Sequence, residues 1–274
     1  MIWGVDLTTM IIRFHRRRCA RIYHRSSVWQ REIFLLVMLF ACASCGKYAQ
    51  QISEKGGRSE MDDLKGVNET AVKQAEPVIY VALGDSTGVG VGARKGGGYV
   101  ARIFHRIERA RPRSRLVNLC MSGATTADVL RAQVNRLADV RPTLVTLGIG
   151  INDVSRNHAP EQFARNYEEI ILKIKERTSA PIVVTNIPDI SFAPVVPAFM
   201  RDEARRRINV YNDHIARLAA KHKLFLVDAY EKSHKVIPTH PEYFSDDNFH
   251  PSDEGYEFWA AMMWQTVKEA IGEE

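Results

Sequence analysis

From residue 77 onward, short apolar runs alternate with stretches whose apolar positions recur every three or four residues. Each short run is rich in β-branched residues and ends at a polar residue or a glycine, which is typical of a buried strand. The longer stretches place their apolar side chains on one face of a helix. The pattern predicts strands at residues 78–83, 115–119, 143–147, 182–186 and 224–227. It predicts helices around residues 100–107, 130–137, 163–174, 204–218 and 251–267.

Five strands that alternate with helices indicate an α/β fold. Connections of this kind produce a parallel sheet that is covered by helices on both faces. In such sheets, functional groups gather beyond the carboxyl ends of the strands. The predicted strand ends carry Gly84-Asp85-Ser86, Ser122-Gly123, the segment Gly148 to Asp153, and Asp228. These positions are therefore the first candidates for a functional site.

The first 77 residues follow a different pattern. Residues 1–31 hold seven arginines and one aspartate, and a 12-residue apolar run follows at residues 33–44. That run is shorter than the roughly 20 residues needed to span a bilayer. A basic stretch, a short apolar stretch and then small residues are typical of a bacterial secretory signal. An uncleaved anchor helix and a buried helix of the fold are the alternative interpretations.

Two cysteines at the end of this run are candidates for lipid attachment. The residues Cys42-Ala43-Ser44-Cys45 resemble the lipobox of bacterial lipoproteins, in which a cysteine is lipidated and becomes the new N-terminus. The resemblance fits Cys45 or, after Leu39-Phe40-Ala41, Cys42. Residues 46–77 are polar and rich in glycine, which is typical of a flexible linker. We expect a leader at 1–45, a linker at 46–77 and a folded domain at 78–274. The protein should be exported to the cell envelope and held at the membrane by an N-terminal lipid.

Charge and cysteine content exclude several classes of function. The chain has a net charge of +6, but residues 78–274 hold 26 basic and 24 acidic side chains. This balance gives no support for nucleic-acid binding. Cys120 is the single cysteine beyond the N-terminal region, so the domain cannot form an internal disulfide. Zinc-binding cysteine and histidine spacings are absent, and no metal site is expected.

A serine at the first strand end and a histidine near the C-terminus suggest nucleophilic catalysis. Ser86 follows the first predicted strand, where its hydroxyl would be exposed. A serine hydroxyl needs a base to take its proton, and the base needs a carboxylate to orient it. Asp247 and His250 are three residues apart on a predicted turn, so they can supply both groups. Asp246 is a competing carboxylate, four residues from the histidine.

The reaction of a serine with a carbonyl also requires donors for the oxyanion that develops. Gly123 and Asn152 follow the second and third predicted strands. A glycine backbone N–H is unobstructed, and an asparagine offers a side-chain N–H₂ group. Each residue also has a structural interpretation, since Gly123 suits an unusual backbone angle and Asn152 suits a turn.

These four segments, taken in order, resemble the four sequence blocks of the SGNH (GDSL) hydrolase family. The blocks are Gly84-Asp85-Ser86, Gly123, Gly150-Ile151-Asn152-Asp153 and Asp247-x-x-His250, and the resemblance covers about residues 78–270. It implies a three-layer α/β/α sandwich with a five-stranded, flavodoxin-like parallel sheet. It also implies that Ser86 is the nucleophile, His250 the base and Asp247 its orienting carboxylate. The backbone N–H groups of Ser86 and Gly123, with the Asn152 side chain, would form the oxyanion hole. The family implies no metal and no organic cofactor.

The resemblance implies a serine esterase that acts through an acyl-enzyme on Ser86. Its substrate would be a small-molecule, lipid or glycan ester, and the sequence does not fix the acyl chain or the alcohol. Acyl transfer to a glycan hydroxyl is an alternative reaction. A second alternative is an envelope lipoprotein that uses the fold for binding without catalysis.

Four further features of the sequence can be explained by a structural role alone. We favour that explanation for three of them and leave the fourth open. Asp85 is expected to brace its turn through hydrogen bonds, and Asp228 to be structural. Residues 88–93 fit a loose dinucleotide-binding pattern without its acidic partner, so we expect a flexible loop beside Ser86. Residues 191–200 are apolar and interrupted by prolines. They are either packing or an acyl-chain wall or lid.

Overall fold

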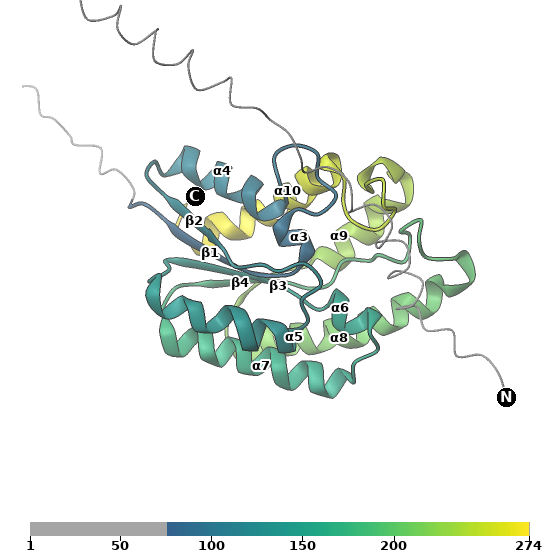
Figure 1. Cartoon of the computed structure of the whole chain (residues 1–274), viewed down its shortest axis with the longest axis horizontal. Coiled ribbons are helices and arrows are strands. Elements are labelled where there is room, and N and C mark those ends of the chain that lie inside the picture. Colours follow the sequence, from purple (N-terminus) through teal and green to yellow (C-terminus); the bar gives the residue numbers. More distant parts are fainter. Residues whose placement is uncertain (1–75, 274) are drawn as a thin grey trace, which may run out of the picture. The chain divides into compact units, whose positions relative to one another are not determined.

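The computed structural model describes residues 76–273, and in them a single parallel sheet forms the centre of the fold (Figure 1). Its strands are β1 (Ile79–Gly84), β2 (Arg115–Asn118), β3 (Leu144–Gly148), β4 (Ile182–Thr185) and β5 (Phe225–Val227). They lie in the order β2-β1-β3-β4-β5, and all pairs are parallel. This is the flavodoxin-like order that the sequence predicted. The predicted leader (1–45) and linker (46–77) lie outside the described residues, apart from the last two linker positions, and remain predictions.

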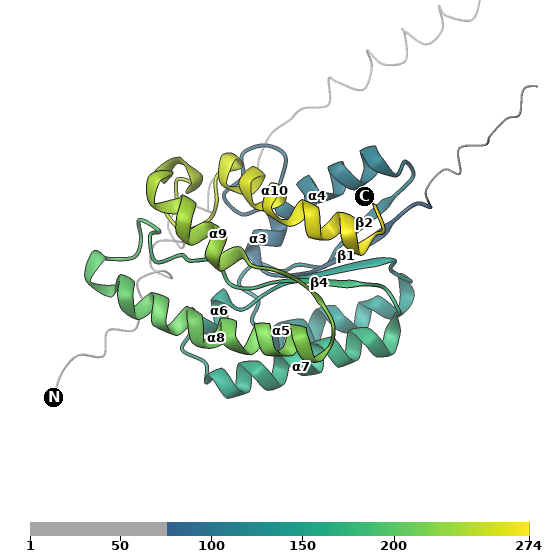
Figure 2. The same cartoon turned by 180° about the vertical axis from the view of Figure 1, so that it is seen from behind.

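Helices cover both faces of the sheet, as Figures 1 and 2 show from opposite sides. One face carries α4 (Tyr99–Ala110) and α10 (Asp253–Ala270), which pack against each other. The other face carries α5 (Thr126–Asp128), α7 (Pro160–Arg177) and α8 (Arg201–Lys221). Three shorter helices follow strands directly: α3 (Ser86–Val89), α6 (Ile151–Ser155) and α9 (Ala229–Val236). The fold is therefore the expected three-layer α/β/α sandwich. Within residues 76–273, no helix is long and apolar enough to cross a membrane.

Each helical layer packs on the sheet through its own apolar core, because the side chains of a strand alternate between the two faces of the sheet. Val81 and Leu83 of β1 point toward α7 and α8, whereas Tyr80 and Ala82 point toward α4 and α10. All of these side chains are buried, as expected for strands in a parallel sheet covered on both faces. The double coverage fixes the register of the central strand and therefore the place where it ends.

The helix predicted around residues 130–137 is irregular in the structure. After α5, the chain continues as one π-helical turn, η2 (Val129–Gln133), and a 3₁₀ segment, η3 (Val134–Asp139). Of the predicted apolar positions, Val134 and Leu137 are fully buried, and Leu130 is half-buried against the same core. Gln133 is also buried, and its side chain bonds to the backbone of β1. Single π-helical turns are rare and often occur at functional sites.

The order of the strands places a crevice at the carboxyl end of β1. From β1 the chain crosses to β2 on one side and then returns to β3 on the other side. Loops that leave such a switch point diverge, and ligands bind in the gap between them. The segment that follows β1 begins with Asp85 and Ser86.

Candidate active site

Ser86 is held at the switch point by the way α3 begins. Asp85 is the N-cap residue of this short helix, and its Oδ1 accepts hydrogen bonds from Thr87 N (3.0 Å) and Thr87 Oγ1 (2.8 Å). Burial raises the pKa of Asp85, an effect that the Thr87 hydrogen bonds oppose. The predicted bracing role of Asp85 thus has a geometric basis. Ser86 itself is buried, yet it lines an apolar pocket.

Asp247 and His250 form a tight pair on the turn before α10. His250 Nδ1 lies 2.5 Å from Asp247 Oδ2. Asp247 Oδ1 accepts three further hydrogen bonds, from Phe249 N (2.9 Å), His250 N (2.8 Å) and Ser245 Oγ (2.9 Å). Partial burial alone would raise the pKa of Asp247, but the hydrogen bonds from His250 and Phe249 outweigh it and lower the pKa overall. The carboxylate is therefore kept ionised beside the imidazole.

The fold brings this pair to Ser86 from the opposite end of the sequence. His250 Nε2 lies 2.9 Å from Ser86 Oγ, across a separation of 164 residues. The imidazole thus connects the hydroxyl and the carboxylate in one hydrogen-bonded chain. This is the geometry in which a histidine can take the serine proton while the carboxylate stabilises the imidazolium. Asp246, the competing carboxylate, pairs instead with Arg94 on the surface.

The three predicted oxyanion donors lie at the carboxyl ends of β1, β2 and β3. Asn152 is in the first turn of α6, and its Nδ2 donates to Ala124 O at 2.9 Å. The amide has a second N–H that this bond does not use. Gly123 has φ = +76°, a value that favours glycine, so the backbone alone explains this residue type. Among residues 76–273, none accepts a hydrogen bond from the Gly123 N–H.

Asp153 joins two of these loops and was not singled out from the sequence. Its fully buried carboxylate accepts hydrogen bonds from Thr126 N (3.0 Å) and Thr126 Oγ1 (2.7 Å). Asp153 thereby ties the turn that holds Asn152 to the loop that follows Gly123. The sequence does place this acidic residue directly after Asn152, at the end of a buried strand. A carboxylate that is buried there needs hydrogen-bond partners, so its position pointed to a bracing role.

The glycine-rich loop after α3 packs against the turn that holds Asp247 and His250. At Gly92, which has φ = +95°, an added Cβ would lie 2.6 Å from Pro251 O and 3.0 Å from His250 Cβ. Tyr256 Oη donates to Val91 O at 2.7 Å, and Asp253 accepts from the backbone N–H groups of the two residues after Ala93. The close contact with the His250 turn explains the glycine at this position, and the loop is anchored to α10.

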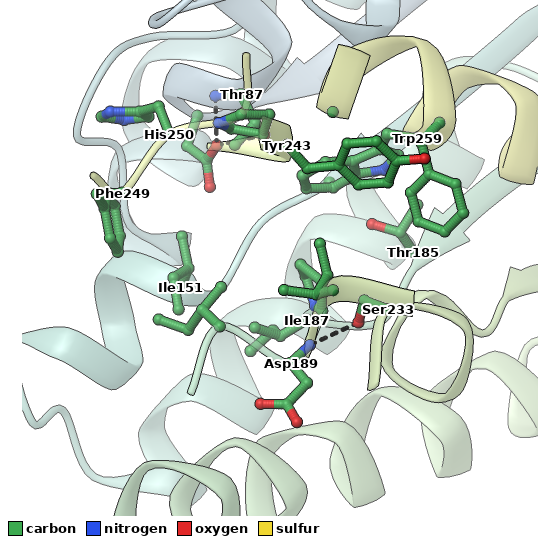
Figure 3. A pocket seen from close by; sticks show the side chains of 18 of the residues that line it. Thr87, Ile151, Thr185, Ile187, Asp189, Ser233, Tyr243, Phe249, His250 and Trp259 are labelled. Atoms are coloured by element: carbon green, nitrogen blue, oxygen red, sulfur yellow. Dashed lines mark hydrogen bonds between the residues drawn. The ribbon is translucent and has the colours of Figure 1, made fainter. Parts of the chain in front are cut away.

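A pocket opens beside Ser86 and His250. Figure 3 shows His250 and Phe249 at one end, and Trp259, Thr185 and Ser233 at the other. Most of the lining is apolar, and it includes Ile149, Ile151, Ile187, Pro188, Ile190, Ile237, Tyr243, Phe244, Phe249, Phe258, Trp259 and Met262. Part of this lining comes from residues 187–190, which directly precede the stretch 191–200 that was considered as an acyl-chain wall. The stretch 191–200 itself does not line this pocket. Its Val195 N donates to Asn248 O, on the turn that holds Asp247 and His250.

Asp228, the other predicted strand-end carboxylate, stands apart from this site. It is the N-cap residue of α9, where its Oδ1 accepts from Glu231 N and Asn186 Nδ2. Within residues 76–273, no group of three or more acidic, histidine or cysteine side chains is arranged to hold a metal ion.

Comparison with known proteins assigns this arrangement to a family. The model of the GDSL-like lipase/acylhydrolase family matches residues 82–258, a range that includes Ser86, Gly123, Asn152, Asp247 and His250. The chain belongs to the GDSL-like lipase/acylhydrolase family. A curated relative, Esterase TesA of Pseudomonas aeruginosa PAO1, is 31% identical over 103 residues. That match covers 38% of this chain and 51% of the relative, so it spans about half of the relative's length.

Solved structures of other proteins share this GDSL-family fold. The crystal structure of TesA matches with a TM-score of 0.59 at 24% identity, covering 70% of this chain and 99% of that chain. The acetylxylan esterase Axe2 of Geobacillus stearothermophilus matches with a TM-score of 0.57 at 22% identity, covering 74% and 97%. At these identities the likeness supports the fold of the domain and leaves its substrate open.

Proposed function

We propose that the protein is a serine esterase in which Ser86 forms an acyl-enzyme. The observation that carries this proposal is the unbroken chain of hydrogen bonds from Ser86 Oγ through His250 to Asp247. Membership of the GDSL-like lipase/acylhydrolase family supports it. A non-catalytic binding protein would have no need for this geometry.

In the first half of the reaction, Ser86 Oγ bonds to the ester carbonyl carbon and His250 Nε2 takes the serine proton. The carbonyl oxygen becomes an oxyanion, which the N–H groups of Ser86, Gly123 and Asn152 stabilise. The tetrahedral intermediate then expels the alcohol, which receives the proton from His250. In the second half, water gives a proton to His250 and attacks the acyl-enzyme, and the acid leaves as Ser86 recovers its proton. Asp247 stays ionised throughout and holds the imidazole in the required tautomer.

Asn152→Ala tests the oxyanion hole. Its hydrogen bond would strengthen as the carbonyl oxygen gains charge, so it would contribute mainly to the transition state. We expect kcat to fall by about 10²–10³-fold, with KM within a few-fold of the wild type. Asn166→Ala is a matched control, since Asn166 Nδ2 donates to Thr126 Oγ1 in the same region but Asn166 is not among the proposed oxyanion donors. If Asn152→Ala lowers the melting temperature and leaves kcat unchanged, the residue is structural only.

The apolar pocket indicates the acyl group of the substrate. Its lining offers few polar partners and much aliphatic and aromatic surface, which suits a hydrocarbon chain. TesA is an esterase and Axe2 is an acetylxylan esterase, so this fold can accept a short acyl group. The apolar character of the pocket favours esters of medium or long acyl chains over acetate esters.

A panel of p-nitrophenyl esters from C2 to C16 tests this preference. Each buried methylene is worth about 0.8 kcal/mol, or roughly fourfold in kcat/KM, until the pocket is filled. We expect kcat/KM to rise from acetate toward decanoate. Ile237→Trp, at the half-buried rim of the pocket, should reduce activity on decanoate and leave acetate hydrolysis near the wild type. A flat profile, or equal losses on both esters, would contradict the assignment of this pocket to the acyl chain.

A further inference from the structure

A buried side-chain amide bonds to both backbone polar groups at the end of β1. Gly84 N donates to Gln133 Oε1 at 2.9 Å, and Gln133 Nε2 donates to Gly84 O at 2.8 Å. Strand β2 ends at Asn118, which pairs with Ala82; beyond it, Met121 N still donates to Gly84 O at 3.1 Å. Gln133 thus supplies the partner of Gly84 N and a second donor to Gly84 O, at the second residue before Ser86.

The same arrangement recurs beyond the end of β4. Ile187 N donates to Asn212 Oδ1 at 2.8 Å, and Asn212 Nδ2 donates to Ile187 O at 2.9 Å. The last paired residue of β4 is Thr185, opposite Val227, so Ile187 has left the sheet. Both amides are buried, and both come from the helical layer that contains α7 and α8.

The two amides hold different parts of the site. Gly84 leads directly into the turn that presents Ser86, whereas Ile187 lines the apolar pocket (Figure 3). A side-chain amide carries one donor and one acceptor in fixed geometry, as a peptide group does. It can therefore extend the sheet's hydrogen bonding past the point where the neighbouring strand ends. Because such bonds are buried, losing them leaves backbone groups unpaired: Gly84 N at the first site, where Gly84 O keeps the bond from Met121 N, and both groups of Ile187 at the second. The strand end must then move to find new partners.

We propose that Gln133 is a positioning residue for Ser86 and that Asn212 is a specificity-determining residue that fixes the pocket wall at Ile187. Both roles rest on the proposed esterase function. Gln133 acts through Gly84 on the distance between Ser86 Oγ and the carbonyl carbon. Asn212 acts through Ile187 on the fit of the acyl chain. The two residues are chemically matched, so each serves as the control for the other.

The experiment compares Gln133→Met with Asn212→Leu, two nearly isosteric changes that remove both hydrogen bonds. The readouts are kcat and KM on p-nitrophenyl acetate and decanoate, the rate of labelling by a small alkyl fluorophosphonate, and melting temperature. Wild-type protein must first hydrolyse these esters and be labelled at Ser86. A wild type that does neither would overturn the proposed function itself, before any variant is compared.

The two variants should change different readouts. Gln133→Met should lower kcat on both esters and the labelling rate by the same factor, about 10²-fold, with KM little changed. Asn212→Leu should leave acetate turnover and labelling within about threefold and lower kcat/KM on decanoate about tenfold, which corresponds to the loss of one to two methylene contacts. Similar losses in melting temperature are expected for both. A folded Gln133→Met protein with normal kcat and labelling would overturn the positioning role. Equal effects of both variants on all readouts would overturn the division of roles.

Gln133→Glu gives a second test that does not depend on Gln133→Met folding. A protonated glutamic acid keeps one donor and one acceptor for Gly84, whereas the ionised form has acceptors only and faces Gly84 O. Burial raises the pKa of such a carboxyl group. As pH rises through that pKa, kcat per folded molecule should fall, giving a limb that the wild type lacks. A pH profile parallel to that of the wild type would overturn the inference.

Discussion

Ser86→Ala is expected to lower kcat for ester hydrolysis by about 10⁶-fold, the scale seen when a nucleophilic serine is removed from a serine hydrolase. The substitution removes the atom that would form the acyl bond and leaves His250 and Asp247 in place. Ester hydrolysis measured per folded molecule checks the size of the loss. Labelling by a fluorophosphonate probe should disappear with it, because the probe reacts with the same oxygen.

Ser114→Ala is the matched control for this loss. Ser114 is a buried serine at the opposite end of β1, where its Oγ donates to Arg111 O and accepts from Val78 N. Its loss should lower the melting temperature and leave turnover and labelling close to the wild type. Persistent labelling of Ser86→Ala would mean that another serine is the nucleophile. Equal turnover in Ser86→Ala and wild type would reject the acyl-enzyme altogether.

The strands and the order of the site residues could be predicted because they depend on local pattern. Each predicted strand agrees with the structure to within one or two residues, since runs such as residues 78–83 have no helical alternative at that length. Once the strands are parallel, their carboxyl ends must share one edge of the sheet. This places Ser86 beside Gly123 and Asn152. The contact between Ser86 and His250, 164 residues apart, was predicted instead from the serine's need for a base and from the order of the four sequence blocks.

Features that depend on packing between distant segments could not be predicted in the same way. The apolar pocket is assembled from β3, β4, the segment after β4, α9 and α10, and no single stretch carries its pattern. Gln133 reads as a polar residue within a helical stretch, and only the packing of η2 against β1 shows that it is the partner of Gly84 N. Hydrophobic periodicity cannot show such a pairing. The interpretation of residues 1–77 as leader and linker remains a prediction.

The choice between two adjacent carboxylates shows how geometry decides what spacing only suggests. Asp246 and Asp247 are chemically identical and one residue apart. The turn directs Asp247 inward, where four hydrogen bonds converge on its two oxygens. Asp246 is largely exposed and bonds to Arg94, which is exposed as well. Spacing relative to His250 favoured Asp247, and the hydrogen bonds from the backbone of the turn give the physical reason.

Asp247→Asn is expected to lower kcat by about 10⁴-fold with little change in melting temperature. Asp247 Oδ1 already accepts from Ser245 Oγ, Phe249 N and His250 N, so the amide oxygen of the variant must take that position. Its N–H₂ group then faces His250 Nδ1, which must become an acceptor. The imidazole proton moves to Nε2, and Nε2 can no longer take the proton of Ser86. The geometry of the site would survive while its base is lost.

Asp246→Asn makes the same chemical change one residue away. Asp246 and Arg94 are both exposed, and water screens such ion pairs strongly, so kcat should stay within about twofold of the wild type. Measuring kcat, fluorophosphonate labelling and melting temperature on both variants separates an orienting carboxylate from a merely nearby charge. If Asp247→Asn keeps its kcat within tenfold, or if Asp246→Asn loses as much, the orienting role does not belong to Asp247. A large loss confined to Asp247→Asn, in a protein that melts at the wild-type temperature, would place the defect in the tautomer of His250.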